Sequence, residues 1–230
     1  MASLPDAAPR LVYDAESVDG TTRVAIAHGA DVVIRPWTGF ARARIDAAAM
    51  VQTPWIFMLD ADERLTPELR AELAALEPPH DVDGYSVARM NFFCGRWIRG
   101  AGWWPDRSVR LFRAGRATLA SRNAASVYAV HERWTVSGRC IQLASPLEHQ
   151  SYATLAAYRA KYAYYTGLEA EGLRGKVSLG SLLVTLGMTP VRALWLLVAR
   201  RGILDGWRGV YVSARSAAYP LAVRWKARRG

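Results

Sequence analysis

Three carboxylates follow an apolar run in the stretch "WIFMLDADE" at 55–63: Asp60, Asp62 and Glu63. Strand side chains alternate, so Asp60 and Asp62 point to one side if the chain stays extended between them. Two carboxylates held this close repel each other unless a cation lies between them. Sites with few protein oxygens suit Mg²⁺ or Mn²⁺ that carries substrate phosphates. The spacing therefore favours a metal and diphosphate site; the alternative is a solvated turn before the next helix, where acids are favourable.

A second acidic stretch, "YDAESVDGT" at 13–21, allows two interpretations. Asp14 ends a predicted strand, and Asp19-Gly20 is a turn signal. In the first interpretation, Ser17 or Asp19 caps the following helix. In the second, Asp14 accepts a hydrogen bond from a nucleotide base. The stretch alone does not decide between them.

The elements that must position these acids alternate between strands and helices. Strands are predicted at 10–14, 31–35 and 55–59, and helices at 18–30, 39–52 and 66–76, the last with Thr66 as N-cap and Pro67 in its first turn. This order predicts an α/β fold with a mainly parallel sheet. The apolar run at 55–59 is typical of a central strand buried on both faces, and ligands bind at the carboxyl edge of such sheets.

The pattern of predicted secondary structure changes after residue 84. Short β-like runs at 85–90, 108–113, 126–130 and 139–144 indicate a β-rich insertion with long loops, and helices are predicted at 152–174 and 177–199. We therefore predict an α/β domain over 1–150 and a basic helical segment over 151–230.

The charge of the chain is concentrated at one end. The net charge is +10, and residues 200–230 hold eight basic residues and one acidic residue, a net of +7. Such a tail favours an anionic membrane surface over a nucleic-acid partner, for which no recognition motif is present. Two cysteines without metal spacing, and no signal peptide at the start, fit a reducing cytoplasmic location.

The stretch 177–199 is long enough to span a membrane. Pro190, Arg192 and four Ser/Thr residues interrupt its apolar character. These interruptions favour an interfacial or buried helix over a span. Helices that simply cover the sheet, with arginines on a solvated face, are the remaining alternative.

Six stretches together resemble one protein family. "VYDAESVDGT" and "WIFMLDADE" resemble motifs of the family-2 inverting glycosyltransferases. "GWWPDRSVRLFR" (102–113), "AVHE" (129–132), "SPLEHQSY" (145–152) and "RRGILDGWRG" (200–209) are similar, in order, to a branch that includes lipopolysaccharide-core glucosyltransferases. The resemblance implies a GT-A fold with a β-rich acceptor-side insertion. It also implies a metal-dependent hexosyltransferase that uses Mg²⁺ or Mn²⁺ and a nucleotide-sugar donor, with a UDP-sugar favoured, and a cell-envelope glycan or glycolipid acceptor.

The resemblance also implies roles on the donor side. Asp14 would face the nucleotide base, Asp60 would lie near the ribose and the metal, and Asp62 would be the direct metal ligand. Arg44 is the one polar residue kept where the family often has "GFxxQKN" and this chain reads "GFARARID". Arg110 suits the pyrophosphate or an acidic acceptor, because guanidinium groups bind phosphate in a bidentate way; its alternative is an ion pair with Asp106.

The catalytic base is expected in "AVHE". Glu132 is the first candidate and His131 the second, because inverting members commonly use a carboxylate. Adjacent strand residues point opposite ways, so only one of the two is expected to face the site. The alternative is that Glu132 pairs with Arg133 or Arg110.

On the acceptor side, Trp103 and Trp104 are candidates for stacking on a sugar ring, and Asp106 is a candidate contact. The alternative places the tryptophans in the core. His149 is expected to be a hydrogen-bonded structural histidine.

One departure from the family leads to a different hypothesis. Members usually open with a strand before the first acidic motif, and only about ten residues precede "LVYD" here. The leading hypothesis is a glycosyltransferase associated peripherally with the inner face of the cytoplasmic membrane. The alternative is a truncated or catalytically impaired relative that acts as a binding or membrane-associated protein.

Overall fold

A computed structural model describes residues 3–5, 8–121 and 132–229. The chain divides into two compact units. The first unit comprises 1–87 and 107–147, and the second comprises 88–106 and 148–230. The segment 88–106 therefore groups with the C-terminal helices.

The first unit begins with the predicted alternation of strands and helices. Its elements are β1 (Leu11–Asp14), α1 (Thr21–Ala27), β2 (Asp31–Ile34) and α2 (Phe40–Met50), followed by β3 (Trp55–Phe57), β4 (Glu63–Leu65) and α3 (Pro67–Ala74). The predicted N-cap of α3 is confirmed: the Thr66 side chain accepts a hydrogen bond from the Leu69 amide at 3.1 Å. The Thr66 hydroxyl also donates to the Pro146 carbonyl at 2.8 Å, which fixes the start of α3.

The strands form a mixed sheet and two small sheets. The remaining strands are β5 (Val82–Phe93), β6 (Arg96–Trp97), β7 (Asp106–Arg113), β8 (Ala117–Ser121), β9 (Glu132–Val136), β10 (Arg139–Gln142) and β11 (Leu147–Tyr152). The seven-stranded sheet has the order β3-β7-β5-β11-β4, and β6 and β10 also pair with β5. β1 and β2 form a parallel pair, and β8 and β9 an antiparallel pair.

The α/β class and the β-rich stretch after residue 84 are confirmed, but the position predicted for β3 is wrong. β3 is an edge strand of the sheet and pairs antiparallel with β7, with Ile56 opposite Phe112. The reason is that β1 and β2 pair with each other and form a separate sheet, so β3 takes its partner from a later part of the chain. The strand predicted at 126–130 lies outside the described residues.

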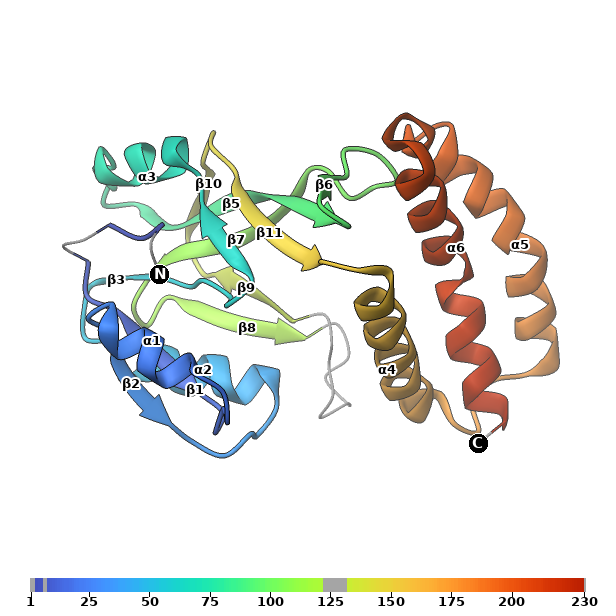
Figure 1. Cartoon of the computed structure of the whole chain (residues 1–230), viewed down its shortest axis with the longest axis horizontal. Helices are drawn as coiled ribbons and strands as arrows, with labels where there is room; N and C mark the ends of the chain where they lie inside the picture. The colour runs from blue at the N-terminus through green and yellow to red at the C-terminus, as the bar shows by residue number, and fades with distance from the viewer. Residues whose placement is uncertain (1–2, 6–7, 122–131, 230) are drawn as a thin grey trace. The chain divides into compact units, whose positions relative to one another are not determined.

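The second unit is built around three helices. They are α4 (Leu155–Leu173), α5 (Leu179–Leu197) and α6 (Gly206–Arg229), with a short 3₁₀ helix η1 (Gly202–Asp205) between the last two. Both α4 and α5 pack on α6, which lies between them (Figure 1). The helices predicted at 152–174 and 177–199 are thereby confirmed.

The motif "RRGILDGWRG" holds two segments of the second unit together. The buried Asp205 carboxylate accepts hydrogen bonds from the amides of Arg99, at 3.1 Å, and Gly100, at 2.7 Å. A Cβ atom at Gly209 would lie 1.8 Å from the Gly202 carbonyl oxygen, so only glycine permits this approach of α6 to η1. The motif therefore fixes the start of α6.

Candidate active site

An apolar cluster in the first unit gathers four elements around one point. Its buried members are Ile56 on β3, Phe112 on β7 and Trp134 on β9, and Ala48 on α2 packs against them. The rings of Phe112 and Trp134 lie 4.7 Å apart. Burial of these large side chains is the main force that brings the four elements together.

Each of these elements also carries one charged candidate in register with its apolar anchor. Arg44 lies four residues before Ala48, which is the same helix face. Arg110 and Glu132 each lie two residues before an anchor, Phe112 and Trp134, so they share that anchor's face of the strand. Asp60 follows β3. The periodicities that bury the anchors therefore also bring these charges together.

The carboxylates after β3 are arranged by a turn and not by an extended strand. Ala61 and Asp62 form the turn, and the Glu63 amide donates to the Asp60 carbonyl at 3.0 Å. The Glu63 side chain returns to accept from the Asp60 amide at 3.0 Å. The prediction that Asp60 and Asp62 share a side of an extended chain is therefore wrong, because the chain reverses between them.

Two arginines neutralise this turn. Arg44 donates to one Asp60 oxygen at 2.9 Å, and Arg110 donates to the other at 3.0 Å. Arg110 also forms an ion pair with Glu63, whose side chain is fully buried. Arg44 reaches Glu132 as well, with 3.7 Å between the guanidinium nitrogen and Oε2. The alternative of an Arg110–Asp106 pair is wrong, since Arg110 pairs with Asp60 and Glu63.

This network of Arg44, Asp60, Glu63, Arg110 and Glu132 sets the ionisation of its members. Burial by itself would raise the pKa of Asp60, but the charges of Arg110 and Arg44 outweigh it and lower that pKa to about 2. Burial likewise opposes the charge on Arg110, and Glu63 and Asp60 overcome this and raise its pKa. Asp60 is therefore an ionised carboxylate at neutral pH.

The low pKa of Asp60 predicts acid sensitivity. The folded-state pKa of about 2 lies below the ordinary value of 3.8, so the stabilisation is present above pH 3.8 and is lost as the pH falls toward 2. It amounts to about 2 kcal/mol in the free energy of unfolding. Urea unfolding between pH 6 and pH 3 should show a steeper loss of stability in the wild type than in Asp60→Asn. Equal slopes would contradict the ion pairs.

Glu132 has the opposite environment. Its side chain is only 4% exposed, and burial raises its pKa while Arg44 and a hydrogen bond with the Ala41 backbone oppose the rise. Its Oε2 atom is buried and has no hydrogen-bond partner among the described residues. A buried carboxylate that has a raised pKa and one oxygen without a hydrogen bond is suited to accepting a proton. His131 lies outside the described residues.

Asp62 lies half-buried in the turn, beside Asp60 and Glu63. Within the described ranges no group of three or more His, Cys, Asp or Glu side chains gathers as a closed metal site. Mg²⁺ is commonly held by one or two carboxylates together with substrate phosphates. Asp62 and Asp60 carry carboxylate oxygens of the kind that such a site uses, and both Asp60 oxygens accept hydrogen bonds from Arg44 and Arg110 in this structure.

Asp14 is buried, and its side chain accepts hydrogen bonds from residues that follow it closely in the chain. Its carboxylate accepts from the Ser17 amide at 3.1 Å, from the Ser17 hydroxyl at 2.5 Å and from the Thr22 hydroxyl at 3.3 Å. The N-cap position of α1 is Gly20 and not Ser17 or Asp19, but the Asp19 carboxylate accepts a hydrogen bond at 2.8 Å from the amide of Thr21, the first residue of α1. Asp14 is not a member of the network around Asp60.

The acceptor-side candidates lie in the second unit. Asp106 forms an ion pair with Arg89, and the Asn91 amide lies 3.4 Å from the same carboxylate. Trp103 and Trp104 are half-buried. Trp103 packs edge-on against Phe93 at 6.1 Å between ring centres, and Trp104 packs edge-on against Trp97 at 5.0 Å.

The structural role predicted for His149 is confirmed. Its Nδ1 atom lies 2.6 Å from the Asn91 side-chain oxygen and 3.1 Å from the Ser151 hydroxyl.

Two partners of the candidate residues could not be predicted from the sequence. Glu63 pairs with Arg110, and Arg89 pairs with Asp106. A buried acid next to an apolar strand is a signal for an arginine partner, because lone buried charges are costly. The sequence offers many arginines, so it does not identify which one.

Comparison with known proteins identifies the family of the chain. The profile of "Glycosyl transferase family 2" matches residues 11–128, which include β1, the turn after β3, and β7. The chain belongs to glycosyl transferase family 2. The GT-A fold expected from the resemblance follows from this membership, and the family is named for glycosyl transfer.

Curated family-2 relatives match over shorter stretches. An uncharacterized glycosyltransferase of Rickettsia prowazekii is 36% identical over 102 residues, which are 44% of this chain and 32% of the relative. The lipopolysaccharide core biosynthesis glycosyltransferase LpsC of Rhizobium meliloti is 33% identical over 120 residues, 50% of this chain and 44% of LpsC. The matched part thus spans less than half the length of these relatives.

Proposed function

We propose that this family-2 glycosyltransferase transfers a hexosyl group, with inversion, from a nucleotide-sugar donor to a hydroxyl group of a cell-envelope glycan or glycolipid such as lipopolysaccharide core. A UDP-sugar is the favoured donor. One observation carries the proposal: the Arg44 guanidinium contacts both Asp60, at 2.9 Å, and Glu132, at 3.7 Å. The Arg44 guanidinium therefore lies between Asp60, the carboxylate assigned to the donor side, and Glu132, the carboxylate assigned as the proton acceptor.

Residues of the network would hold the donor. Arg110 is 5% exposed, and its Nε atom is buried with no hydrogen-bond partner among the described residues. An open guanidinium donor of this kind suits a diphosphate oxygen. We assign Asp60 to the ribose side of the donor and Asp14 to the nucleotide base, the latter because the family resemblance implies it.

The charge balance of the network supports the need for a cation. It contains three carboxylates, Asp60, Glu63 and Glu132, and two guanidinium groups. A diphosphate adds further negative charge to a site that is already net negative when all of these groups are ionised. Mg²⁺ or Mn²⁺ held by Asp62 and Asp60 would supply positive charge that neutralises the departing nucleoside diphosphate.

Glu132 would act as the catalytic base. In its ionised form, Oε2 takes the proton of the acceptor hydroxyl as that oxygen bonds to the anomeric carbon from the face opposite the leaving group. The bond between the anomeric carbon and the phosphate oxygen breaks, and the products are the glycoside and the nucleoside diphosphate. Arg44 holds the Glu132 carboxylate in place, and its positive charge opposes the rise of the Glu132 pKa that burial causes.

The name of one relative and the chemistry of the chain support the proposed acceptor and location. The name of LpsC supports an acceptor in lipopolysaccharide core biosynthesis. We assign Trp103, Trp104 and Asp106 to the acceptor side. The two cysteines are free thiols, which fits a reducing cytoplasm, and a lipid-borne acceptor implies work at the inner face of the membrane.

The test of this proposal is metal-dependent donor binding. Isothermal titration of UDP and of UDP-sugars should show binding with Mn²⁺ that is lost when the metal is chelated. Asp62→Ala should weaken it by more than about 100-fold, since even outer-shell partners of metal ligands cost about 10- to 100-fold. Asp81→Ala, at an exposed ion pair with Arg139 in the same unit, is the matched control and should bind like the wild type.

Two outcomes would contradict the proposal. Binding that is indifferent to both Mn²⁺ and Asp62 would exclude the metal site. A wild type that binds no nucleotide would favour the catalytically impaired relative.

A further inference from the structure

The helix α5 has an inverted pattern of polarity. Its large apolar side chains point outward: Leu183, Val184, Leu186, Val191, Leu194 and Trp195 are each at least half exposed. Its side toward α6 carries Thr185 and Thr189 beside the buried Leu182 and Leu196. Surface helices in water keep most of their large apolar side chains on the side that faces the protein. A helix with most of its large apolar side chains outside and with hydroxyl groups inside is suited to a lipid environment.

The inward hydroxyl groups are satisfied within the helix itself. Thr185 donates to the Ser181 carbonyl at 2.7 Å, and Thr189 donates to the Thr185 carbonyl at 2.8 Å. These side chains therefore need no water. Only 11% of the residues in the apolar window of α5 are buried, so α5 is not a core helix. Of the two placements predicted for the helix at 177–199, interfacial or buried, the buried one is wrong.

The exposed apolar surface continues past the end of α5. Val198, Ile203 and Leu204 are 62%, 59% and 71% exposed, and η1 packs against both α5 and α6. The outward side chains of α5 together with these three residues are called the α5 surface below. Contiguous exposed apolar area of this kind marks an interaction site in a water-soluble unit.

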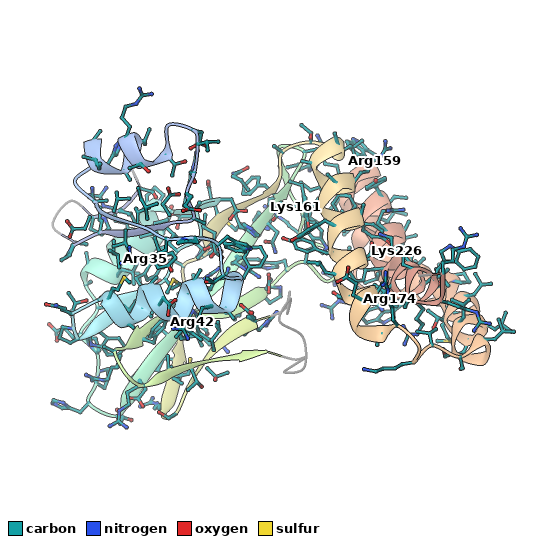
Figure 2. The ribbon with its side chains drawn as sticks, turned by 90° about the horizontal axis from the view of Figure 1, so that it is seen from below. Arg35, Arg42, Arg159, Lys161, Arg174 and Lys226 are labelled. Carbon is teal, nitrogen blue, oxygen red and sulfur yellow. The ribbon has the colours of Figure 1, made fainter. Side chains whose placement is uncertain are left out.

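Basic groups border the α5 surface. Arg192 and Arg224 line a notch of about 190 Å³ between α5 and α6, together with apolar side chains such as Met188. An anionic headgroup above acyl chains is complementary to paired arginines set in an apolar notch. Figure 2 shows further basic side chains in the second unit, among them Arg174 at the end of α4 and Lys226 on α6, which donates to Ala163 and Thr166 of α4.

Three exposed tryptophans of the second unit each have an arginine side chain stacked over the ring. Arg200 lies over the Trp195 ring at 5.4 Å, Arg208 over Trp207 at 4.8 Å and Arg229 over Trp225 at 4.3 Å. Tryptophan is enriched at the interface between membrane and water, where its ring lies at the level of the headgroups. Arginine beside it places positive charge where lipid phosphates lie.

We infer that the α5 surface docks on an anionic phospholipid bilayer, with α5 lying in the plane of the interface and its outward side chains inserted among the acyl chains. Among the described residues one helix, Leu179–Leu197, has the length and composition to cross a membrane. However, α6 packs along α5 and carries Arg208, Arg215 and Arg224. A spanning α5 would carry these charges into the hydrocarbon, whereas an in-plane helix does not.

The inference rests on the membrane association in the proposed function, but its test needs no sugar transfer, so either one can fail alone. The full chain is floated with vesicles of phosphatidylcholine and with vesicles that also contain phosphatidylglycerol. We expect binding to the anionic vesicles, weakened by high salt. Val191→Glu with Leu194→Glu should abolish it, and Val24→Glu with Ile26→Glu, at two exposed apolar sites on α1, should not.

A second pair of variants isolates the charges. Arg192→Gln with Arg224→Gln should weaken partition onto anionic vesicles by about fivefold for each arginine. Arg35→Gln with Arg42→Gln removes the same charge from the first unit and should have no such effect (Figure 2). Circular dichroism of each variant confirms that the helices remain.

Four results would overturn the inference. They are absence of binding by the wild type to either vesicle, unchanged binding of the α5 variant, and resistance to extraction by alkaline carbonate, which indicates a span. The fourth is a wild-type dimer that the α5 variant dissociates without any vesicle binding, which would make this surface an interface between copies.

Discussion

Replacing Glu132 by Gln should lower the turnover number by about 100- to 10,000-fold, the usual contribution of a general base. Glutamine keeps the shape of the side chain but does not accept a proton at neutral pH. The site is 4% exposed, and the substitution removes a buried charge, so the fold should tolerate it. Turnover is measured as UDP release from a UDP-sugar in the presence of lipopolysaccharide core oligosaccharide.

The pH profile gives this prediction a second readout. Burial raises the pKa of Glu132 above its ordinary value of 4.5, and a base must be ionised to act. Wild-type turnover should therefore rise with pH through a pKa above 4.5, and the residual turnover of Glu132→Gln should lack this acid limb. Mn²⁺-dependent UDP binding should be retained, because Glu132 acts on the acceptor and not on the nucleotide.

Controls separate catalysis from damage to the fold. Glu68→Gln, on the exposed first turn of α3, should leave turnover unchanged. If Glu132→Gln keeps more than a tenth of the wild-type turnover, Glu132 is not the base. In that case His131→Gln becomes the decisive variant, since His131 is the other residue that the "AVHE" motif offers.

The local elements could be predicted because short-range patterns encode them. The start of α3 at Thr66-Pro67 and the strand–helix alternation up to that point depend on caps, turns and periodicity within a few residues. The same applies to α4 and α5. The sheet partners did not follow, because an apolar run such as 55–59 specifies a strand but not whether its neighbour is β1 or β7. That choice is made by contacts between residues more than 50 positions apart, such as Ile56 and Phe112.

The candidate site was predictable in its members more than in its connections. Asp60, Arg44, Arg110 and Glu132 were all chosen from the sequence, and the structure brings these four into one network. The pairing itself depends on the turn at Ala61 and Asp62. This turn brings the Glu63 side chain within hydrogen-bonding distance of the Asp60 amide. A turn of two residues leaves no periodic pattern in the sequence from which it could be predicted.

Arg110→Met should lower the free energy of unfolding by about 3–5 kcal/mol, the usual cost of removing one partner from a buried ion pair. The Arg110 side chain is 6% exposed and that of Glu63 is 0% exposed, so the variant leaves the Glu63 carboxylate buried without its countercharge. Asp60 keeps Arg44 as a partner and contributes less to the loss. Equilibrium unfolding in urea measures the change, and Arg64→Met, on the exposed side of β4, should stay within about 0.5 kcal/mol of the wild type.

A double variant distinguishes lost countercharge from lost packing. Glu63→Gln added to Arg110→Met removes the buried charge while keeping an oxygen for the hydrogen bond from the Asp60 amide. Because replacing both partners of a buried pair by neutral groups is often close to neutral, most of the lost stability should return. A double variant as unstable as Arg110→Met alone would show that the guanidinium acts through packing. The network would then hold its shape by contacts other than the charge on Glu63.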